Sequence, residues 1–342
     1  MKKIVFLLFG IILTLQLCAQ NLDSLFYNRS PKHKHPSKFF LFKTDTTKQP
    51  ESPISFSVLN NIWNNPAYTG FEKRHTVNLN SEMYMPFIED SLYTPKKFSL
   101  SYDVSLGKKK RTGMGIYAAQ SYFSVESWID LMFSFSKEFV IRKTNHLRFA
   151  LTLGYSQRSV DYRMMSFGDQ IDPHYGFIRY TFETKLSELT TRFVDFNSGF
   201  FFSRKNFFFG ASIQHLTQPN MGYFSVGKIG MNQMINTGYR IKVNKDIFLT
   251  PSIELFKIIP YTFYYFSPAI ILSYKEKFLL GFDYKYFSSF NTTAGINLWK
   301  KMMITATCGF PTDRIIYSLS PISYLQLGIR YQINKEKQEN IK

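Results

Sequence analysis

The fold is decided by stretches of strict alternation, of which the clearest is Lys97-Phe98-Ser99-Leu100-Ser101-Tyr102-Asp103-Val104-Ser105-Leu106. Every even position in this stretch is apolar, and every odd position is polar or charged. Because successive side chains of a strand point to opposite faces, the pattern predicts a strand with one apolar face and one polar face. The same period recurs over residues 129–136, 147–156 and 325–333, and no comparable stretch has the helical period of 3.6.

Segments of this kind predict about 14 strands, at residues 76–84, 97–106, 113–121, 126–138, 147–158, 192–203, 207–215, 234–243, 247–257, 266–275, 278–286, 292–299, 302–309 and 323–333. Short connections, such as Arg204-Lys205-Asn206, alternate with longer ones, of which the longest are at about 159–191 and 216–233. Outer-membrane barrels have this alternation, with tight periplasmic turns and longer surface loops. A soluble β-sandwich could share it, but would bury more aliphatic and fewer aromatic residues.

The composition agrees with a barrel in lipid. Aromatic residues make up 18% of the 342 residues and charged residues only 19%, against a typical ~25%. Mean hydropathy is nevertheless −0.17, so apolar and polar residues must be interleaved. The aromatic content excludes a disordered chain, and after the N-terminal segment no run of ~20 apolar residues offers a spanning helix.

We therefore predict an all-β fold: a closed antiparallel transmembrane β-barrel of about 14 strands with an N-terminal arm. Closure satisfies every backbone polar group in lipid without leaving a sheet edge. Leu131 and Leu151 are expected to face the lipid, where Arg should damage assembly. Ser101 and Thr152 are expected to face the lumen, where Arg should be tolerated. The interfacial aromatic girdles are expected to include Trp128, Tyr284, Tyr286 and Trp299.

Four segments are predicted along the chain. Residues 1–20 have a basic start, an apolar run and a small-residue exit, as in a cleaved signal peptide; Leu17 is too bulky to favour lipidation of Cys18. Residues 21–75 form a Pro-punctuated arm that ends in a turn, 76–333 the barrel and 334–342 a polar tail. Cys308 is the other cysteine, so the mature chain is expected to form no internal disulfide.

The sequence contains no recognisable catalytic motif, and we assign no catalytic, cofactor-binding or metal-binding residue and expect no enzyme. His33 and His35 lie in a solvated basic run without further ligands nearby. His215 is interpreted as a polar group at a strand end rather than as a catalytic base. The charged residues expected in the lumen form either a bracing network or, with one sign dominant, an ion-selective pore; they are Asp103, Asp130, Asp195, Glu254, Asp283, Arg148, Arg240, Lys285 and Arg330.

The most specific motif lies before the first strand and reads Asn65-Pro66-Ala67-Tyr68-Thr69-Gly70. It resembles the Asn-Pro-Ala-Tyr-Ala-Gly hallmark of the PorP/SprF family, and looser matches follow in order over nearly the whole mature chain, including Gly113 to Tyr117 and Phe209 to Leu216. The arm over residues 21–50 is longer than is usual in the family, and the last strand lacks the common Ser-His-Glu ending. Asn-Pro and Thr-Gly are also plain turn signals, so we expect a compact turn that packs on or in the barrel.

The resemblance implies a non-enzymatic outer-membrane partner of the type IX secretion system of Bacteroidetes. Such a protein would support the secretion or surface attachment of cargo such as gliding adhesins or proteins with type B C-terminal domains. Its expected partners are a secreted cargo protein, other type IX components and outer-membrane lipid. The alternative is an outer-membrane channel or porin-like transporter.

The formal charge of +18 does not predict a nucleic-acid partner, because the chain is expected to be exported. Cations concentrate in the short turns, and four are consecutive: Lys108, Lys109, Lys110 and Arg111. Snorkelling at the membrane edge and attraction to anionic lipid heads are two explanations. We predict instead that this turn docks an acidic periplasmic protein. The other turn cations are Arg142, Lys143, Arg204, Lys205, Lys245, Lys275, Lys277, Lys300 and Lys301.

Overall fold

The computed structural model describes residues 61–87, 94–141, 144–161, 165, 167–172, 174–177, 189–223, 227–259, 264–285, 289–299, 301–312 and 320–333. The signal peptide, the C-terminal tail and residues 21–60 of the arm therefore lie outside the described residues, as do Tyr286, Arg142, Lys143 and Lys300. In the described part of the chain, no helix is long and apolar enough to cross a membrane.

A closed antiparallel barrel of 14 strands holds most of the described residues, as predicted. The first seven barrel strands are β1 (His75–Tyr84), β2 (Lys96–Leu106), β3 (Thr112–Phe123), β4 (Glu126–Ile141), β5 (Asn145–Val160), β8 (Thr190–Arg204) and β9 (Phe207–Gln214). The other seven are β10 (Met231–Tyr239), β12 (Ile247–Ile259), β13 (Tyr264–Tyr274), β14 (Phe278–Lys285), β15 (Ser289–Leu298), β16 (Met302–Pro311) and β17 (Tyr324–Ile333).

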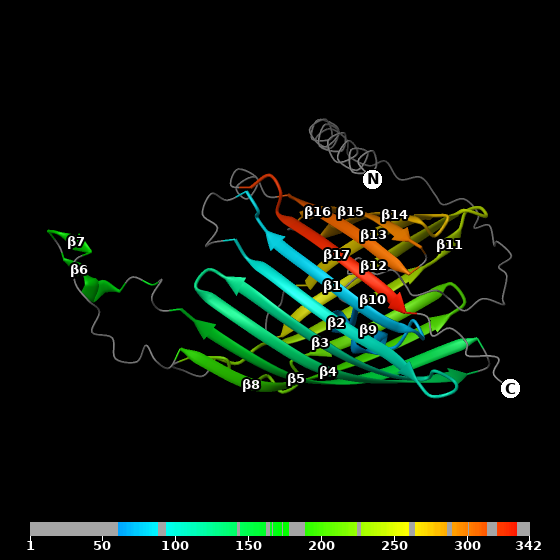
Figure 1. The fold of residues 1–342 in the computed structure, drawn as a ribbon, viewed down its shortest axis with the longest axis horizontal. Coiled ribbons are helices and arrows are strands. Elements are labelled where there is room, and N and C mark those ends of the chain that lie inside the picture. The colour runs from blue at the N-terminus through cyan, green and yellow to red at the C-terminus, as the bar shows by residue number, and fades with distance from the viewer. Residues whose placement is uncertain are drawn as a thin grey trace. The chain divides into compact units, whose positions relative to one another are not determined.

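Each barrel strand pairs with the next one along the chain, and the ring closes where β1 pairs with β17, from His75 opposite Ile333 to Tyr84 opposite Tyr324. Figure 1 shows this closure, with blue β1 beside red β17. The two-residue strand β11 (Ile241–Lys242) also pairs with β12. A separate hairpin joins β6 (Ile171–Asp172) to β7 (Gly176–Phe177).

The two faces of the barrel are those that the alternation predicts. Leu131 and Leu151 are 48% and 65% exposed, whereas Ser101 and Thr152 are 4% and 2% exposed. The outer face is thus apolar, as lipid contact requires, and polar side chains line the interior. Interior positions can satisfy one another there: Asn78 donates to Ser101, and Arg330 donates to Asn78.

Short connections gather at one rim, which we call the short-turn rim. It is the end of the barrel where β1 begins and β17 ends, and it carries the β2–β3, β4–β5, β8–β9, β13–β14 and β15–β16 turns. The alternation of loop lengths is less strict than predicted, because Ser124 and Val125 alone connect β3 to β4 at the opposite rim. In bacterial outer-membrane barrels, the rim with short turns is periplasmic.

Candidate functional site

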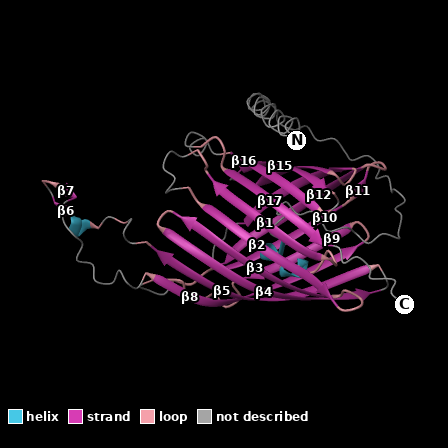
Figure 2. Ribbon diagram, in the orientation of Figure 1, coloured by secondary structure: helices cyan, strands magenta, loops and turns pink. Residues whose placement is uncertain are grey.

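The candidate site is the motif turn, which lies inside the barrel. It comprises the helix α2 (Asn61–Asn64), the 3-10 helix η1 (Pro66–Tyr68) and the residues that follow to Gly70. Figure 2 shows this helical segment in cyan among the magenta strands. Asn65, Ala67 and Thr69 are each 0% exposed. The predicted packing of the turn is therefore confirmed, and its place is the lumen.

The motif residues explain the local conformation of the turn. The Asn65 side chain accepts a hydrogen bond of 2.9 Å from the Ala67 N–H, which caps η1. Pro66 occupies the first turn of η1, where its missing N–H is not needed. Gly70 has a φ of +66°, a left-handed conformation that glycine adopts without strain.

The first half of the turn is bound to β8 and β9. The Asn65 amide Nδ2 donates to the backbone carbonyls of Phe200 at 3.0 Å and Ala211 at 3.3 Å. Ser212 and Gln214 of β9 donate to the carbonyls of Asn64 and Trp63. Asn65 thus caps its own helix with its oxygen and binds the barrel wall with its nitrogen.

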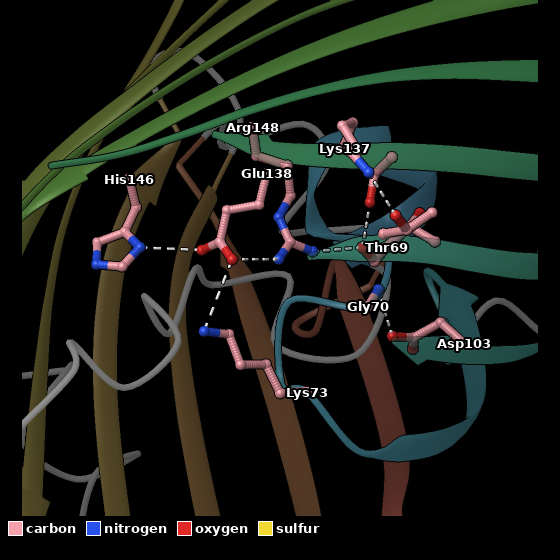
Figure 3. A network of polar contacts seen from close by, with 10 residues as sticks. Thr69, Gly70, Lys73, Asp103, Lys137, Glu138, His146 and Arg148 are labelled. Carbon is pink, nitrogen blue, oxygen red and sulfur yellow. Dashed lines mark hydrogen bonds and ion pairs between the residues drawn. The ribbon is translucent and has the colours of Figure 1, made fainter. Parts of the chain in front are cut away.

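The second half of the turn is bound to β2, β4 and β5. The Thr69 carbonyl accepts hydrogen bonds from Arg148 Nη1 at 2.7 Å and from Ser136 Oγ at 2.6 Å. The Gly70 N–H donates to Asp103 Oδ2 at 2.8 Å, and Thr69 Oγ1 lies 2.7 Å from Ser134 Oγ. Figure 3 shows Arg148 and Asp103 reaching this part of the turn. The bond from the Arg148 guanidinium involves a charged group, which makes it stronger than a bond between neutral groups.

Aromatic contacts fill the space between the turn and the wall. The Tyr68 and Phe71 rings each lie 5.2 Å from the Phe201 ring, centroid to centroid. The Tyr68 hydroxyl also accepts a 2.9 Å hydrogen bond from Asn236 Nδ2. On the other side, the Trp63 ring lies 5.3 Å from the Tyr117 ring, and the Lys97 ammonium lies 4.4 Å from the Trp63 centroid.

Glycines of the wall make room for the turn. A Cβ added at Gly113 would lie 2.2 Å from the Thr69 carbonyl oxygen, and one at Gly199 would lie 2.2 Å from Asn65 Oδ1. A strand glycine often marks the close approach of another backbone. These two glycines show that the wall and the turn are matched in shape.

A charged cluster lies beside the turn on the side of the short-turn rim. The Glu138 carboxylate contacts the Lys73 ammonium at 3.6 Å, His146 Nδ1 at 3.0 Å and Arg148 Nη2 at 3.8 Å. Figure 3 shows these three groups around Glu138. Because Arg148 also binds Thr69, the cluster connects the motif to the segment that leads into β1.

The structure brings some of the predicted lumenal charges to the turn and places others elsewhere. Asp103 and Arg148 bind the turn directly. Asp195 holds His215 at 2.6 Å, just beyond the end of β9, where His215 was expected to be a strand-end group. Arg240 instead stacks on Phe248 at 4.2 Å. The remaining lumenal contacts join Asp130 to Ser156, Asp283 to Asn291 and Arg330 to Asn78.

A cavity of about 340 Å³ lies in the lumen next to the turn. Trp63 and Lys97 line it where it meets the turn, and Glu254, Asp283 and Lys285 line it elsewhere. The motif turn therefore fills only part of the lumen. In the described part of the chain, no group of three or more His, Cys, Asp or Glu side chains is arranged to hold a metal ion.

The second predicted site, the basic turn from Lys108 to Arg111, is separate from the motif. Lys108, Lys109 and Lys110 are exposed at the short-turn rim. Lys110 Nζ donates to the Lys73 carbonyl at 3.1 Å, so this lysine reaches towards the lumen entrance. Of the other predicted turn cations, Arg204, Lys205, Lys245, Lys275, Lys277 and Lys301 are also exposed at this rim.

Sequence reasoning missed the residues of the wall that hold the turn: Gly113, Ser134, Ser136, Gly199 and Ser212. Their signal in the sequence is small polar or glycine residues at lumen-facing positions of otherwise regular strands. The sequence does not show which segment these residues contact, because the contacts join residues more than 40 positions apart, as for Gly113 and Thr69 or Ser134 and Thr69. Period alone does not predict such contacts.

A closed antiparallel barrel with an apolar outer face and a polar interior defines the class of outer-membrane β-barrel proteins. The chain belongs to the PorP/SprF family, because the family model of the type IX secretion system membrane protein PorP/SprF matches residues 49–329. The resemblance carried by the Asn65–Gly70 motif is thus confirmed. No curated protein sequence matches the chain.

Solved structures of outer-membrane transporters are similar to the chain at low identity and with TM-scores below 0.5. The Ralstonia pickettii toluene transporter TbuX is 10% identical, with a TM-score of 0.47 over 80% of this chain and 93% of that one. The Pseudomonas putida toluene transporter TodX is 11% identical, with a TM-score of 0.47 and the same coverages of 80% and 93%. A Pseudomonas aeruginosa FadL homologue is 11% identical, with a TM-score of 0.45 over 81% and 94%.

Proposed function

We propose that this protein is a non-enzymatic outer-membrane partner of the type IX secretion system that supports the secretion or surface attachment of specific cargo. Cargo of this kind includes gliding adhesins and proteins with type B C-terminal domains, in a bacterium of the Bacteroidetes. The proposal includes export through a cleaved N-terminal signal peptide and contact with other type IX components. Family membership supports the association with the secretion system.

The observation that carries the proposal is the motif turn bound inside the lumen. Hydrogen bonds with β2, β5, β8 and β9 hold it, and one of them comes from the charged guanidinium of Arg148. A segment held in this way narrows the path through the barrel, which favours a partner protein over a passive pore. The histidine–carboxylate pairs, His215 with Asp195 and His146 with Glu138, brace strand ends, and we assign neither a catalytic role.

The test is affinity purification of the tagged protein from native outer membranes, followed by mass spectrometry. We expect a large secreted protein to co-purify at a level well above that found with an unrelated tagged barrel from the same membranes. Recovery of the barrel without any secreted protein would overturn the proposal.

The second candidate is a channel, and the cavity of about 340 Å³ beside the turn favours it. Its wall carries carboxylates, ammonium groups and aromatic rings, a lining suited to small polar solutes. A channel should show steady single-channel conductance in planar bilayers. A cargo partner whose turn stays in place should show little.

The proposal further includes an acidic periplasmic protein docked on the turn from Lys108 to Arg111. The exposed lysines there support it, since charge steering acts over a Debye length of ~8–10 Å. Replacing all four cations by Gln should reduce cargo retention at the cell surface at a normal barrel level, whereas Lys245→Gln at the same rim should not. If cargo retention were unchanged in the fourfold variant, this turn would serve only to anchor the barrel at the edge of the membrane.

A further inference from the structure

A groove on the outer surface of the barrel combines cations with exposed apolar side chains near the short-turn rim. It lies between the β2–β3 turn and the outward faces of β4 and β5. Its cations are Lys109, Arg111 and Lys137, and its apolar walls include Phe139 and Phe149. The groove is distinct from the lumenal site, because Phe139 and Phe149 belong to the lipid-facing rows and are 50% and 52% exposed.

Lys137 is unusual for its position. It interrupts the outward apolar row of β4, between Phe135 and Phe139, and is paired with Phe149 across to β5. A lysine on the lipid face of a barrel is strongly destabilising at the bilayer midplane but is tolerated near the interface. Its charge therefore places the edge of the hydrocarbon layer close to Lys137.

The length of β4 agrees with this placement. The strand has 16 residues, which at ~3.3 Å per residue and a tilt of ~40° span roughly 40 Å along the barrel axis. The hydrocarbon layer is only ~30 Å thick, so an end of β4 extends to the level of the lipid headgroups. Phe139 and Ile141 follow Lys137 towards the rim and thus flank the headgroup layer.

The cations of the groove are available for a ligand. Lys137 Nζ donates one hydrogen bond, to Thr112 Oγ1 at 2.9 Å, and an ammonium has three donors. Among the described residues, no carboxylate forms an ion pair with Lys109, Arg111 or Lys137, and the nearby Glu138 carboxylate is engaged by Lys73, His146 and Arg148. Three uncompensated cations around an apolar wall fit a phosphate group that carries acyl chains.

We propose that this groove is a binding site for one anionic glycerophospholipid of the periplasmic leaflet. The phosphate binds between Lys137 and Arg111, and an acyl chain passes Phe149, which is paired with Lys137, and extends from there into the hydrocarbon layer. Lys108 and Lys110, in the same turn as Arg111, do not line the groove, so the lipid does not compete for them with a periplasmic protein. The choice of lipid over protein rests on Lys137, which faces the bilayer side of the wall, where a soluble periplasmic protein does not reach.

The test is native mass spectrometry of the purified full-length protein in detergent with added phosphatidylglycerol or phosphatidylcholine of equal chain length. We expect the protein to retain phosphatidylglycerol preferentially. Lys137→Gln and Arg111→Gln should each weaken that binding about fivefold, the factor that corresponds to ~1 kcal/mol per cation. Lys245→Gln, at the same rim but away from the groove, should leave binding unchanged. A heat-modifiable electrophoretic shift verifies that each variant is folded.

Three results would overturn the proposal. The first is equal retention of the two lipids by the wild-type protein. The second is an equal loss of binding in Lys245→Gln and Lys137→Gln. The third is binding of a soluble oligoglutamate peptide that is lost in Lys137→Gln, which would make the groove a protein site.

Discussion

Replacing Gly113 by Ala should release the motif turn from the barrel wall. The added carbon would lie 2.2 Å from the Thr69 carbonyl oxygen and 2.4 Å from Ser136 Oγ. A carbon and a carbonyl oxygen in contact are normally ~3.3 Å or more apart. The Thr69 carbonyl must therefore move by roughly 1 Å, because β3 is fixed by its pairing with β2 and β4.

The size of the effect follows from the bonds that this movement breaks. The Thr69 carbonyl accepts from Arg148 at 2.7 Å and from Ser136 at 2.6 Å, and a shift of ~1 Å takes both donors beyond hydrogen-bonding distance. A hydrogen bond to a charged group contributes ~1.5–3 kcal/mol and a neutral one ~0.5–1.5 kcal/mol. The opening free energy of the turn should therefore fall by about 2–4 kcal/mol. That loss corresponds to an opening equilibrium constant that is roughly 30-fold to 700-fold larger.

Hydrogen exchange of the amides of residues 67–71 measures this opening directly. The matched control is Gly154→Ala, whose added carbon would meet its nearest neighbour, Met132 Cγ, at an ordinary 3.5 Å. Both variants should keep the folded barrel's electrophoretic mobility. If these amides exchanged equally fast in the two variants, the close fit of Gly113 to the turn would not stabilise the turn, and our reasoning would be refuted.

Two further variants test the outer face and the aromatic packing. Leu151→Arg places a charge at an outward-facing position where the side chain is 65% exposed, and should destabilise the folded barrel by ~2–4 kcal/mol if the position lies near the bilayer midplane. A heat-modifiability assay should show a smaller folded fraction for this variant, whereas Leu151→Phe should assemble normally. Tyr68→Phe removes the acceptor of the Asn236 amide and leaves a buried donor unpaired, so the free energy of unfolding in urea should fall by ~1–3 kcal/mol. Tyr239→Phe on the exposed outer face should change that free energy by less than ~0.5 kcal/mol.

Alternation was sufficient to predict the barrel because each strand contacts lipid on one face and the lumen on the other. The pattern was less informative about where a strand ends, because hydrogen bonds to other segments can end it. Residues 234–243 were predicted as one strand, but β10 runs from Met231 to Tyr239. The Arg240 N–H binds the Asn206 carbonyl, and Ile241 and Lys242 continue separately against β12.

The lumen was predicted less well than the outer face. Arg was expected to have only a mild effect at Ser101 and Thr152, because both positions face the lumen rather than the lipid. The structure fills the lumen at this level, since the two side chains are 4% and 2% exposed and Ser101 accepts a hydrogen bond from Asn78. We now expect Arg at either position to disturb interior packing. The alternation shows which side chains point inwards, but it carries no information about what occupies the interior.

Because the motif is buried, it does not itself contact a partner protein. Asn65, Ala67 and Thr69 are 0% exposed, so no partner on either side of the membrane reaches their side chains while the turn stays in place. Their hydrogen bonds instead fix the segment that runs from the lumen through Lys73 into β1 at the short-turn rim. The motif therefore sets how the chain enters the barrel, and under the proposed function the same motif would be compatible with different cargo proteins. Residues that choose among partners must lie outside it, and the exposed basic turn at the rim meets that requirement.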